Sequence, residues 1–152
     1  MPVNKNGFAQ ICIVVKDVRA AAKMWSLVLG IDEPEIEERH LETSDEFPYT
    51  YRGEFEPCDL LVADIHITDG LVIELHQPAG GESSFEEFIR KHGNGVHHLG
   101  FEVGDARDSV IEELKSLGFD TNRTFGAYEG SSWTIVDSED TLGVNLNIKP
   151  VR

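Results

Sequence analysis

The sequence predicts an α+β fold in which two paired βαβββ modules form a curled, eight-stranded mixed sheet around a central cleft. Two internal matches lead to this prediction. Residues 10–32 align with residues 98–120 without a gap and share six identical positions. The segment GLVIEL at 70–75 aligns in turn with GVNLNI at 143–148. Because both ends of the unit recur in the same order, we expect two structurally equivalent units.

Each unit begins with a short strand of alternating apolar residues, followed by a helix. The strand ends at an aspartate suited to cap the helix, Asp17 or Asp105, and a Leu-Gly pair ends the helix at Gly30 or Gly118. Apolar side chains recur at helical spacing and predict one buried face per helix. That face consists of Ala21, Met24, Trp25 and Val28 in the first copy and of Val110, Leu114 and Leu117 in the second.

The middle of the first unit is longer than that of the second by about fifteen residues, which must lie between Asp32 and Gly70. We interpret residues 38–57, which are polar, aromatic and proline-containing, as a long loop that could act as a lid. Further strands are expected in both units, at 59–67 and 71–78 around a Thr-Asp-Gly turn and at 131–137 and 143–148.

We expect one domain over residues 1–152, made of repeats at about 7–78 and 95–150. The linker between them, residues 79–94, contains a short amphipathic helix. Ser83 or Ser84 is its expected cap, and His92-Gly93 its expected end. Neither repeat is long enough to bury a sizeable core alone, so the two are expected to share one.

Strand alternation predicts which side chains face the cleft. On the first and last strand of each unit, the residues opposite the helix-facing set are polar at equivalent positions. They are Gln10, Glu74, His98 and Asn147. One imidazole, one carboxylate and two amide oxygens can form an open site for a divalent ion. His97, the immediate neighbour of His98, is predicted to point to the opposite face of the strand.

Composition excludes several classes of partner. The formal net charge of −15 argues against nucleic acid and anionic membranes, which need clustered lysine and arginine. No apolar run is long enough to span a bilayer, and no signal-peptide pattern is present, so a cytoplasmic location is expected. The two cysteines, Cys12 and Cys58, form no CxxC pair and are expected to be reduced structural thiols.

The segments FAQICIVVKDV, GLVIELHQP, GVHHLGFEV and GVNLNI, in this order, resemble the vicinal oxygen chelate superfamily of glyoxalases, bleomycin-resistance proteins and dioxygenases. The stretch SSFEEFIRKHGNGVHHLGFEV is most similar to methylmalonyl-CoA epimerase and glyoxalase I-like members. This resemblance implies one divalent metal ion (Zn, Ni, Co, Mn or Fe), a small-molecule substrate and a homodimer. Carried across position by position, it implies Gln10, Glu74, His98 and Asn147 as the metal ligands.

The resemblance further implies a lyase or isomerase that acts on a small substrate with vicinal oxygens through a metal-stabilised enediolate. Asn147 departs from the pattern, because the glyoxalase and the epimerase have a glutamate there and asparagine cannot accept a proton. The expected base is therefore Glu74, with Glu54 and Glu56 of the long loop as alternatives. Substrate contacts are expected from His76, Glu102, Tyr51 and Arg52.

A second hypothesis belongs to a different class of protein. The chain could be a metal-free protein that sequesters a small molecule, as bleomycin-resistance relatives do. Glu74 and His98 argue against this alternative, whereas Gln10 and Asn147 argue partly for it. Metal content and metal-dependent thermal stability would separate the two hypotheses.

Overall fold

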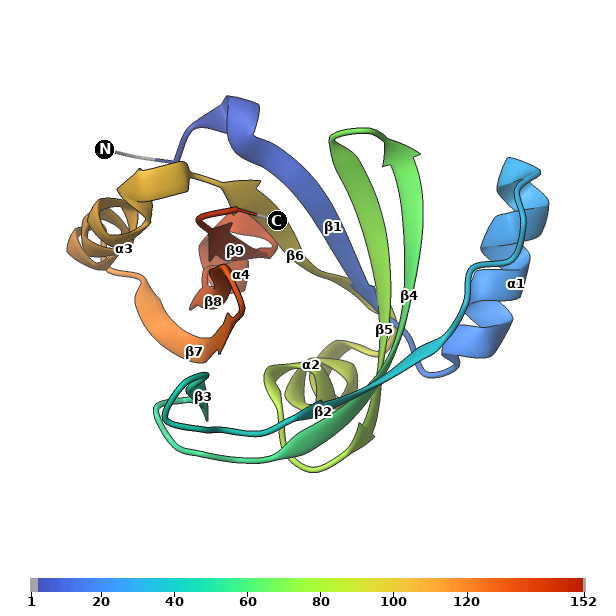
Figure 1. Cartoon of the computed structure of the whole chain (residues 1–152), viewed down its shortest axis with the longest axis horizontal. Helices are drawn as coiled ribbons and strands as arrows, with labels where there is room; N and C mark the ends of the chain where they lie inside the picture. Colours follow the sequence, from blue (N-terminus) through green and yellow to red (C-terminus); the bar gives the residue numbers. More distant parts are fainter. Residues whose placement is uncertain (1–2, 152) are drawn as a thin grey trace.

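The computed structural model describes residues 3–151, which form a single curled sheet with helices on both of its sides (Figure 1). The described residues contain nine strands in the spatial order β2-β4-β5-β1-β6-β9-β8-β7-β3. Their bounds are Phe8–Val14 (β1), Glu37–Leu41 (β2), Tyr49–Tyr51 (β3), Cys58–Thr68 (β4), Leu71–Gly80 (β5), Gly95–Glu102 (β6), Asp120–Tyr128 (β7), Ser131–Asp137 (β8) and Asn145–Lys149 (β9).

The predicted pair of βαβββ modules is confirmed. The first module contributes β2-β4-β5-β1 and the second contributes β7-β8-β9-β6 in the same relative order. In each module the first and last strands pair in parallel, β1 with β5 and β6 with β9. An antiparallel pairing between β1 and β6 joins the modules at the centre of the sheet. The sequence repeat is therefore a structural repeat, and equivalent positions of the two copies meet at this junction.

The prediction of eight strands and an irregular long loop was wrong in detail. Residues 38–57, expected as a loop, contain most of β2 and all of β3. β2 is an edge strand with the polar sequence EERHL, and it pairs with β4. Because the strand is half-exposed, its sequence lacks the alternating apolar residues that would identify it as a strand. The three-residue strand β3 crosses to the second module and pairs with β7. The extra residues of the first module thus extend the sheet and connect its two ends.

The helices comprise Val18–Leu29 (α1), Ser84–His92 (α2), Arg107–Ser116 (α3) and the single turn Glu139–Leu142 (α4). The Asp17 carboxylate accepts from the Ala20 N–H and Ser83 Oγ accepts from the Glu86 N–H, as the capping patterns predict. Asp105 caps nothing, because a 3₁₀ turn at Gly104–Ala106 delays the start of α3 until Arg107. None of the helices within residues 3–151 is long and apolar enough to cross a membrane.

α1 and α3 cover the convex side of the sheet at opposite ends of the molecule, whereas α2 closes the bottom of the concave side (Figure 1). The predicted face of α1 is confirmed in part, because Ala21 and Trp25 pack against the core while the fully buried stripe of the helix lies beside them. Its buried residues are Val18, Ala22 and Ser26, while Met24 and Val28 are 61% and 70% exposed. α1 carries apolar side chains around most of its circumference, so periodicity alone could not identify the small-residue stripe that approaches the sheet. In α3, Val110 and Leu114 are buried as predicted but Leu117 is exposed.

An ion-pair network fixes β3 against the second module. Arg123, 2% exposed, contacts carboxylates of Glu87, Asp137 and Glu139 at 2.6–3.0 Å. Arg52, just after β3, shares Glu87 and Asp137 with it at 2.6 Å each. Because several charges of both signs meet here, the network holds the end of β3 on α2 and β8 more firmly than one surface pair would.

Candidate metal and substrate site

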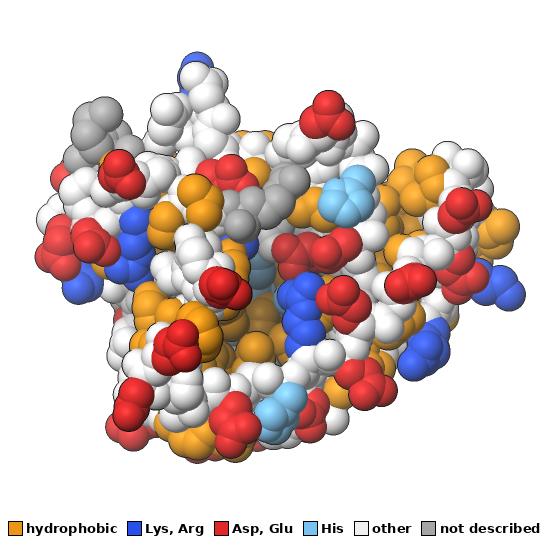
Figure 2. Space-filling view, viewed as in Figure 1, with side chains coloured by type: hydrophobic (Ala, Val, Ile, Leu, Met, Phe, Trp, Pro, Cys, Tyr) orange, Lys and Arg blue, Asp and Glu red, His pale blue; other side chains and the backbone are white. Residues whose placement is uncertain are grey.

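The four side chains predicted to face the cleft all line one cavity of about 570 Å³ on the concave side of the sheet. Each comes from one of the four central strands, Gln10 from β1, Glu74 from β5, His98 from β6 and Asn147 from β9. Figure 2 shows the molecule hollowed between its two halves, with acidic side chains around the opening. Strand alternation therefore correctly predicted the side chains that converge here.

The strand register places these side chains at two levels. Cys12 pairs with Glu74 on one side and with His98 on the other, so one level contains the carboxylate and the imidazole. Gly100 pairs with Gln10 and with Asn147, so the next level contains the two amides. Because Gly100 has no side chain, Gln10 lies over it and its Oε1 accepts from Asn147 Nδ2 at 3.1 Å. The two amides thus touch directly.

The carboxylate of Glu74 is held as an anion. Burial by itself would raise its pKa, but the hydrogen bond from His76 Nε2 to its Oε1 at 2.8 Å, with nearby positive charge, lowers the pKa to about 2. Glu74 is therefore ionised throughout the physiological range. A permanently charged carboxylate suits a metal ligand better than a proton acceptor, since a base is most effective with a pKa near the working pH.

His98 presents a nitrogen with nothing to bind. The side chain is 2% exposed, and burial lowers its pKa well below the usual range, so the ring is neutral. Its Nδ1 contacts His97 Nδ1 at 2.8 Å, whereas its Nε2 is buried without a hydrogen-bond partner in residues 3–151. A buried polar atom without a partner costs free energy unless a ligand or ion satisfies it.

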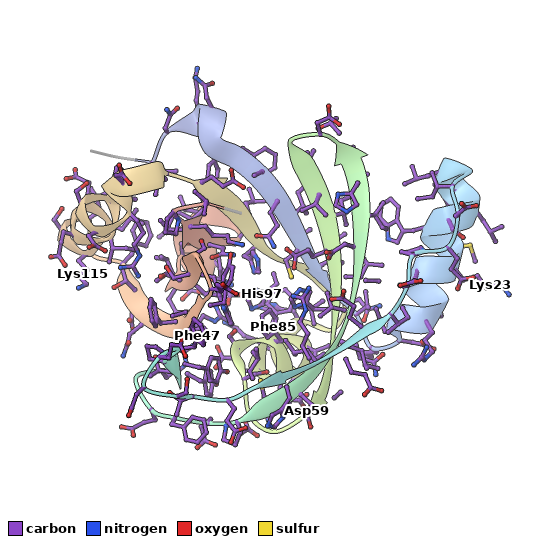
Figure 3. All side chains as sticks on the ribbon, viewed as in Figure 1. Lys23, Phe47, Asp59, Phe85, His97 and Lys115 are labelled. Atoms are coloured by element: carbon purple, nitrogen blue, oxygen red, sulfur yellow. The ribbon has the colours of Figure 1, made fainter. Side chains whose placement is uncertain are left out.

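The prediction that His97 points away from His98 was wrong. The register of β1 against β6 shifts between Cys12, opposite His98, and Ile13, opposite Val96, so that His97 forms a β-bulge. The bulge breaks the alternation and turns the His97 ring to the concave side, where it stacks on Phe85 of α2 (Figure 3). His97 lies beneath the cavity and does not line it.

Comparison with known families identifies the fold. Residues 9–135 match the model of the glyoxalase/bleomycin resistance protein/dioxygenase superfamily, which is most of the chain. The chain belongs to this superfamily. No curated protein matches the sequence significantly.

Solved structures of this fold superimpose over nearly the whole chain. They include a hypothetical protein from Bacillus halodurans C-125, with 21% identity, a TM-score of 0.61 and coverage of 93% of this chain and 91% of that one. A methylmalonyl-CoA epimerase in complex with methylmalonyl-CoA and NH4+ has 21% identity, a TM-score of 0.59 and coverage of 93% and 92%. The methylmalonyl-CoA epimerase from Mycobacterium tuberculosis has 22% identity, a TM-score of 0.56 and coverage of 96% of this chain and 88% of that one. Because these identities are low, the similarity shows that the chain shares its fold with the epimerases and carries no further conclusion about its activity.

The remaining predicted residues are divided between the cavity and other places. His76 lines the cavity beside Glu74. Glu102 lines a smaller neighbouring pocket of about 80 Å³, which shares Gln10 and Glu74 with the main cavity. Tyr51 and Arg52 do not line the cavity, since their side chains bind Glu87 in the ion-pair network. The two glutamates expected as alternative bases, Glu54 and Glu56, are exposed and also lie outside the cavity lining.

One residue of the cavity, Asp64, was not predicted from the sequence. This residue is directly opposite Glu74 on β4, lines the cavity, and has one buried oxygen, Oδ1, without a partner in residues 3–151. Burial, followed by the charge of Glu74, raises its pKa. The signal was present in the segment DLLVADIHI, because Leu60, Val62 and Asp64 alternate onto one face with an acidic residue after two buried apolar ones.

Aromatic side chains form one wall of the cavity, and two of them, Trp133 and Phe85, were not predicted to lie there. Trp133 of β8 lies across Gly126 of β7, where a Cβ would collide with the indole ring. It neighbours Phe85 and Tyr49 at ring distances of 6.3 and 6.1 Å. These rings make one side of the cavity apolar opposite the polar side chains of the central strands, an arrangement typical of small-molecule sites.

The residues on the cavity floor fit a divalent cation of the kind common in this superfamily. Glu74 supplies an anionic oxygen, His98 an unpartnered imidazole nitrogen, and Gln10 an amide oxygen. Asn147, the fourth predicted ligand, is already hydrogen-bonded, since its Oδ1 accepts from the Thr134 N–H at 3.2 Å and its Nδ2 donates to Gln10. It therefore positions Gln10, and its Oδ1 keeps a second lone pair with which it could also ligate an ion.

A second group of donor atoms lies under this floor. Cys12 Sγ and one ring nitrogen each of His97 and His98 lie within 4.8 Å of one another, and all three residues are buried. Burial and the charges of Glu74 and Asp64 raise the pKa of the Cys12 thiol. A metal ion bound here would have to displace the thiol proton, whereas on the cavity floor Glu74 is ionised and His98 Nε2 has no partner in residues 3–151.

Proposed function

We propose that the protein is a divalent-metal-dependent lyase or isomerase of the glyoxalase or epimerase type, acting on a small substrate with vicinal oxygens. The observation that supports this most strongly is the unpartnered Nε2 of His98 in the same cavity as the ionised Glu74. Glu74, His98 and Gln10 would hold the cation, with Asn147 orienting Gln10. When bound, the cation would supply the positive charge that stabilises an enediolate.

The proton acceptor in this proposal is Asp64. Glu74, the base expected from the sequence, has a pKa of about 2 and is hydrogen-bonded to His76, so it can hold a cation but is a weak proton acceptor. Asp64 faces the same cavity, has a raised pKa and carries a free buried oxygen within the described residues. It can accept the proton that leaves the carbon next to the substrate carbonyl and return it to the same or a neighbouring atom.

The aromatic wall and the basic groups at the opening would bind the rest of the substrate. Trp133, Tyr49 and Phe85 offer apolar surface, and Arg39 and Lys149 are the arginine and lysine that line the cavity within the described residues. Lys149 lies over the Tyr128 ring at 5.3 Å. An acidic substrate group would be attracted to these two cations despite the net negative charge of the chain.

The experiment combines metal binding with proton exchange. Calorimetric titration with Mn²⁺ and Co²⁺ should show one site per chain, lost in Glu74→Gln and His98→Ala and kept in His92→Ala, whose side chain binds Glu139 away from the cavity. The loaded protein should then catalyse deuterium exchange next to the carbonyl in one member of a panel of 2-oxoaldehyde adducts, acyl-CoA thioesters and hydroxy-keto acids. Asp64→Asn should abolish exchange without abolishing metal binding.

A metal-free binding protein is the second candidate function. It is favoured by the hydrogen bond between Gln10 Oε1 and Asn147 Nδ2, which gives two of the four predicted metal ligands a hydrogen-bond partner without an ion. In that case, none of the divalent ions would raise the melting temperature, and small aromatic or apolar ligands would do so through the wall of Trp133 and Phe85. Thermal shifts with metals and with a ligand library, measured on the same preparation, separate the two functions.

A further inference from the structure

His97 is completely buried beneath the cavity, and its two ring nitrogens have different partners. Nε2 lies 3.3 Å from the backbone carbonyl oxygen of Ser84, and Nδ1 lies 2.8 Å from His98 Nδ1. The ring is clamped between Phe85 and Phe88 of α2, at centroid distances of 4.7 and 5.2 Å. Helix α2 thereby fixes both the position and the orientation of the imidazole.

These contacts determine where the protons are. A carbonyl oxygen can only accept, so His97 Nε2 must carry a hydrogen and donate to Ser84. A neutral imidazole has one N–H, and a second proton on His97 would leave a charged ring buried against the Ser84 carbonyl, His98 and two phenylalanine rings, none of which carries a negative charge. His97 Nδ1 is then an acceptor, and the hydrogen in its contact with His98 must belong to His98 Nδ1. His98, neutral as well, is left with a bare lone pair on Nε2.

We propose that His97 is a positioning residue that holds His98 in the Nδ1–H tautomer and thereby presents the Nε2 lone pair to a ligand in the cavity. The chain of hydrogen bonds runs from His98 Nδ1–H to His97 and from His97 Nε2–H to the Ser84 carbonyl. It explains why His98 Nε2 is buried without a partner in residues 3–151. Metal-bound histidines commonly donate their other N–H to a fixed acceptor, and here the acceptor is a second histidine.

The bulge in β6 is what makes this possible. Without the register shift opposite Cys12 and Ile13, His97 would point to the convex side and could not reach the ring of its neighbour. In this adjacent pair of histidines, His98 is thus the ligand and His97 is the residue that fixes its tautomer. That the ligand is a cation rests on the proposed function, whereas the tautomer itself does not.

The first test measures the tautomers in the metal-free protein. Imidazole ¹⁵N chemical shifts and long-range ¹H–¹⁵N couplings at pH 7 should show His98 protonated at Nδ1 and His97 at Nε2, each as one form. Finding His98 protonated at Nε2, or exchanging between both forms, would overturn the proposal. This readout needs neither metal nor activity, so it remains informative if the protein proves to be a metal-free binder.

The second test removes one hydrogen bond of His97 at a time. His97→Asn keeps an acceptor near the position of Nδ1, His97→Gln keeps a donor near Nε2 but not the acceptor, and His97→Phe keeps only the ring packing on Phe85 and Phe88. We expect His98 to remain in the Nδ1–H form in the asparagine variant alone. In the glutamine and phenylalanine variants it should populate both forms, and Mn²⁺ affinity should fall by about tenfold or more.

The pattern across the variants separates positioning from packing. If His97 acts only by filling space, the phenylalanine variant will keep wild-type Mn²⁺ affinity and the asparagine variant will lose it, which contradicts the proposal. Melting temperatures of all three variants show whether each remains folded. If the wild-type protein binds no metal while its tautomers are as expected, the proposed function fails and the positioning role of His97 stands.

Discussion

The side chain of Gln10 lies directly over the backbone of Gly100 on the neighbouring strand. A Cβ at position 100 would sit 2.7 Å from the Cβ of Gln10, closer than real Cβ atoms approach other side chains. The space left by this glycine allows the Gln10 amide to reach Asn147, 137 residues away in the chain. The shape of the candidate cation site thus depends on position 100 being a glycine.

Gly100→Ala should therefore impair the site more than the fold. We expect it to displace Gln10, weaken Mn²⁺ binding by about tenfold or more, and cost about 1–3 kcal/mol of stability through overpacking. Gly95→Ala on the same strand is the matched control, because its added Cβ would meet Phe88 at an ordinary 3.6 Å. Calorimetric titration and urea denaturation of both variants measure the two effects. Equal Mn²⁺ affinity in wild type and Gly100→Ala would show that Gln10 is not a ligand.

Glu74 should make the stability of the protein depend on pH in the acid range. Its pKa falls from 4.5 in the unfolded chain to about 2 in the folded protein, so the folded state binds fewer protons at intermediate pH. The resulting stabilisation, on the order of 3 kcal/mol, is fully present above about pH 4.5 and is lost as the pH falls toward 2. The difference in unfolding free energy between wild type and Glu74→Gln should shrink over this interval. A difference that stays constant from pH 5 to pH 2.5 would contradict the assignment.

The internal repeat made most of this fold predictable. Gln10, Glu74, His98 and Asn147 could be placed in one cavity because two copies of one module repeat both spacing and face. The errors arose where long-range contacts override local pattern. The bulge at His97 depends on how β6 pairs with β1. β2 is a half-exposed edge strand, and β3 is an edge strand of three residues of which only Tyr49 is buried. Sequence periodicity carries no information about either.

Replacement of Asn147 tests whether a second negative charge strengthens metal binding at this site. Asn147→Glu should tighten Mn²⁺ binding, because it adds a second anionic oxygen beside Glu74 and a side chain long enough to reach the cavity. Asn147→Asp is the shorter control: it can still accept from the Thr134 N–H but no longer donates to Gln10. We expect tighter binding in the glutamate variant only, measured by competition with a metal indicator. No change in the glutamate variant would place position 147 outside the coordination sphere.

Arg52 should matter for the stability of β3 rather than for ligand binding. Its guanidinium is partly exposed and shares Glu87 and Asp137 with the buried Arg123. Arg52→Gln should cost about 1 kcal/mol and accelerate amide exchange in β3. Arg123→Gln removes the buried guanidinium that neutralises three half-buried carboxylates and should cost about 3–5 kcal/mol. Urea denaturation ranks the two. Loss of ligand binding in Arg52→Gln at unchanged stability would instead support the substrate contact expected from the sequence.

Cobalt spectroscopy distinguishes the cavity floor from the cluster under it. Co²⁺ bound by Glu74, His98 and Gln10 has only oxygen and nitrogen ligands, so it should show weak visible bands without an intense sulfur-to-cobalt charge-transfer band in the near ultraviolet. Co²⁺ bound by Cys12, His97 and His98 would show that band. Cys12→Ser is the diagnostic variant and Cys58→Ser its control, since both cysteines are buried but only Cys12 adjoins the histidines. A charge-transfer band that disappears in Cys12→Ser and persists in Cys58→Ser would move the metal to the buried cluster.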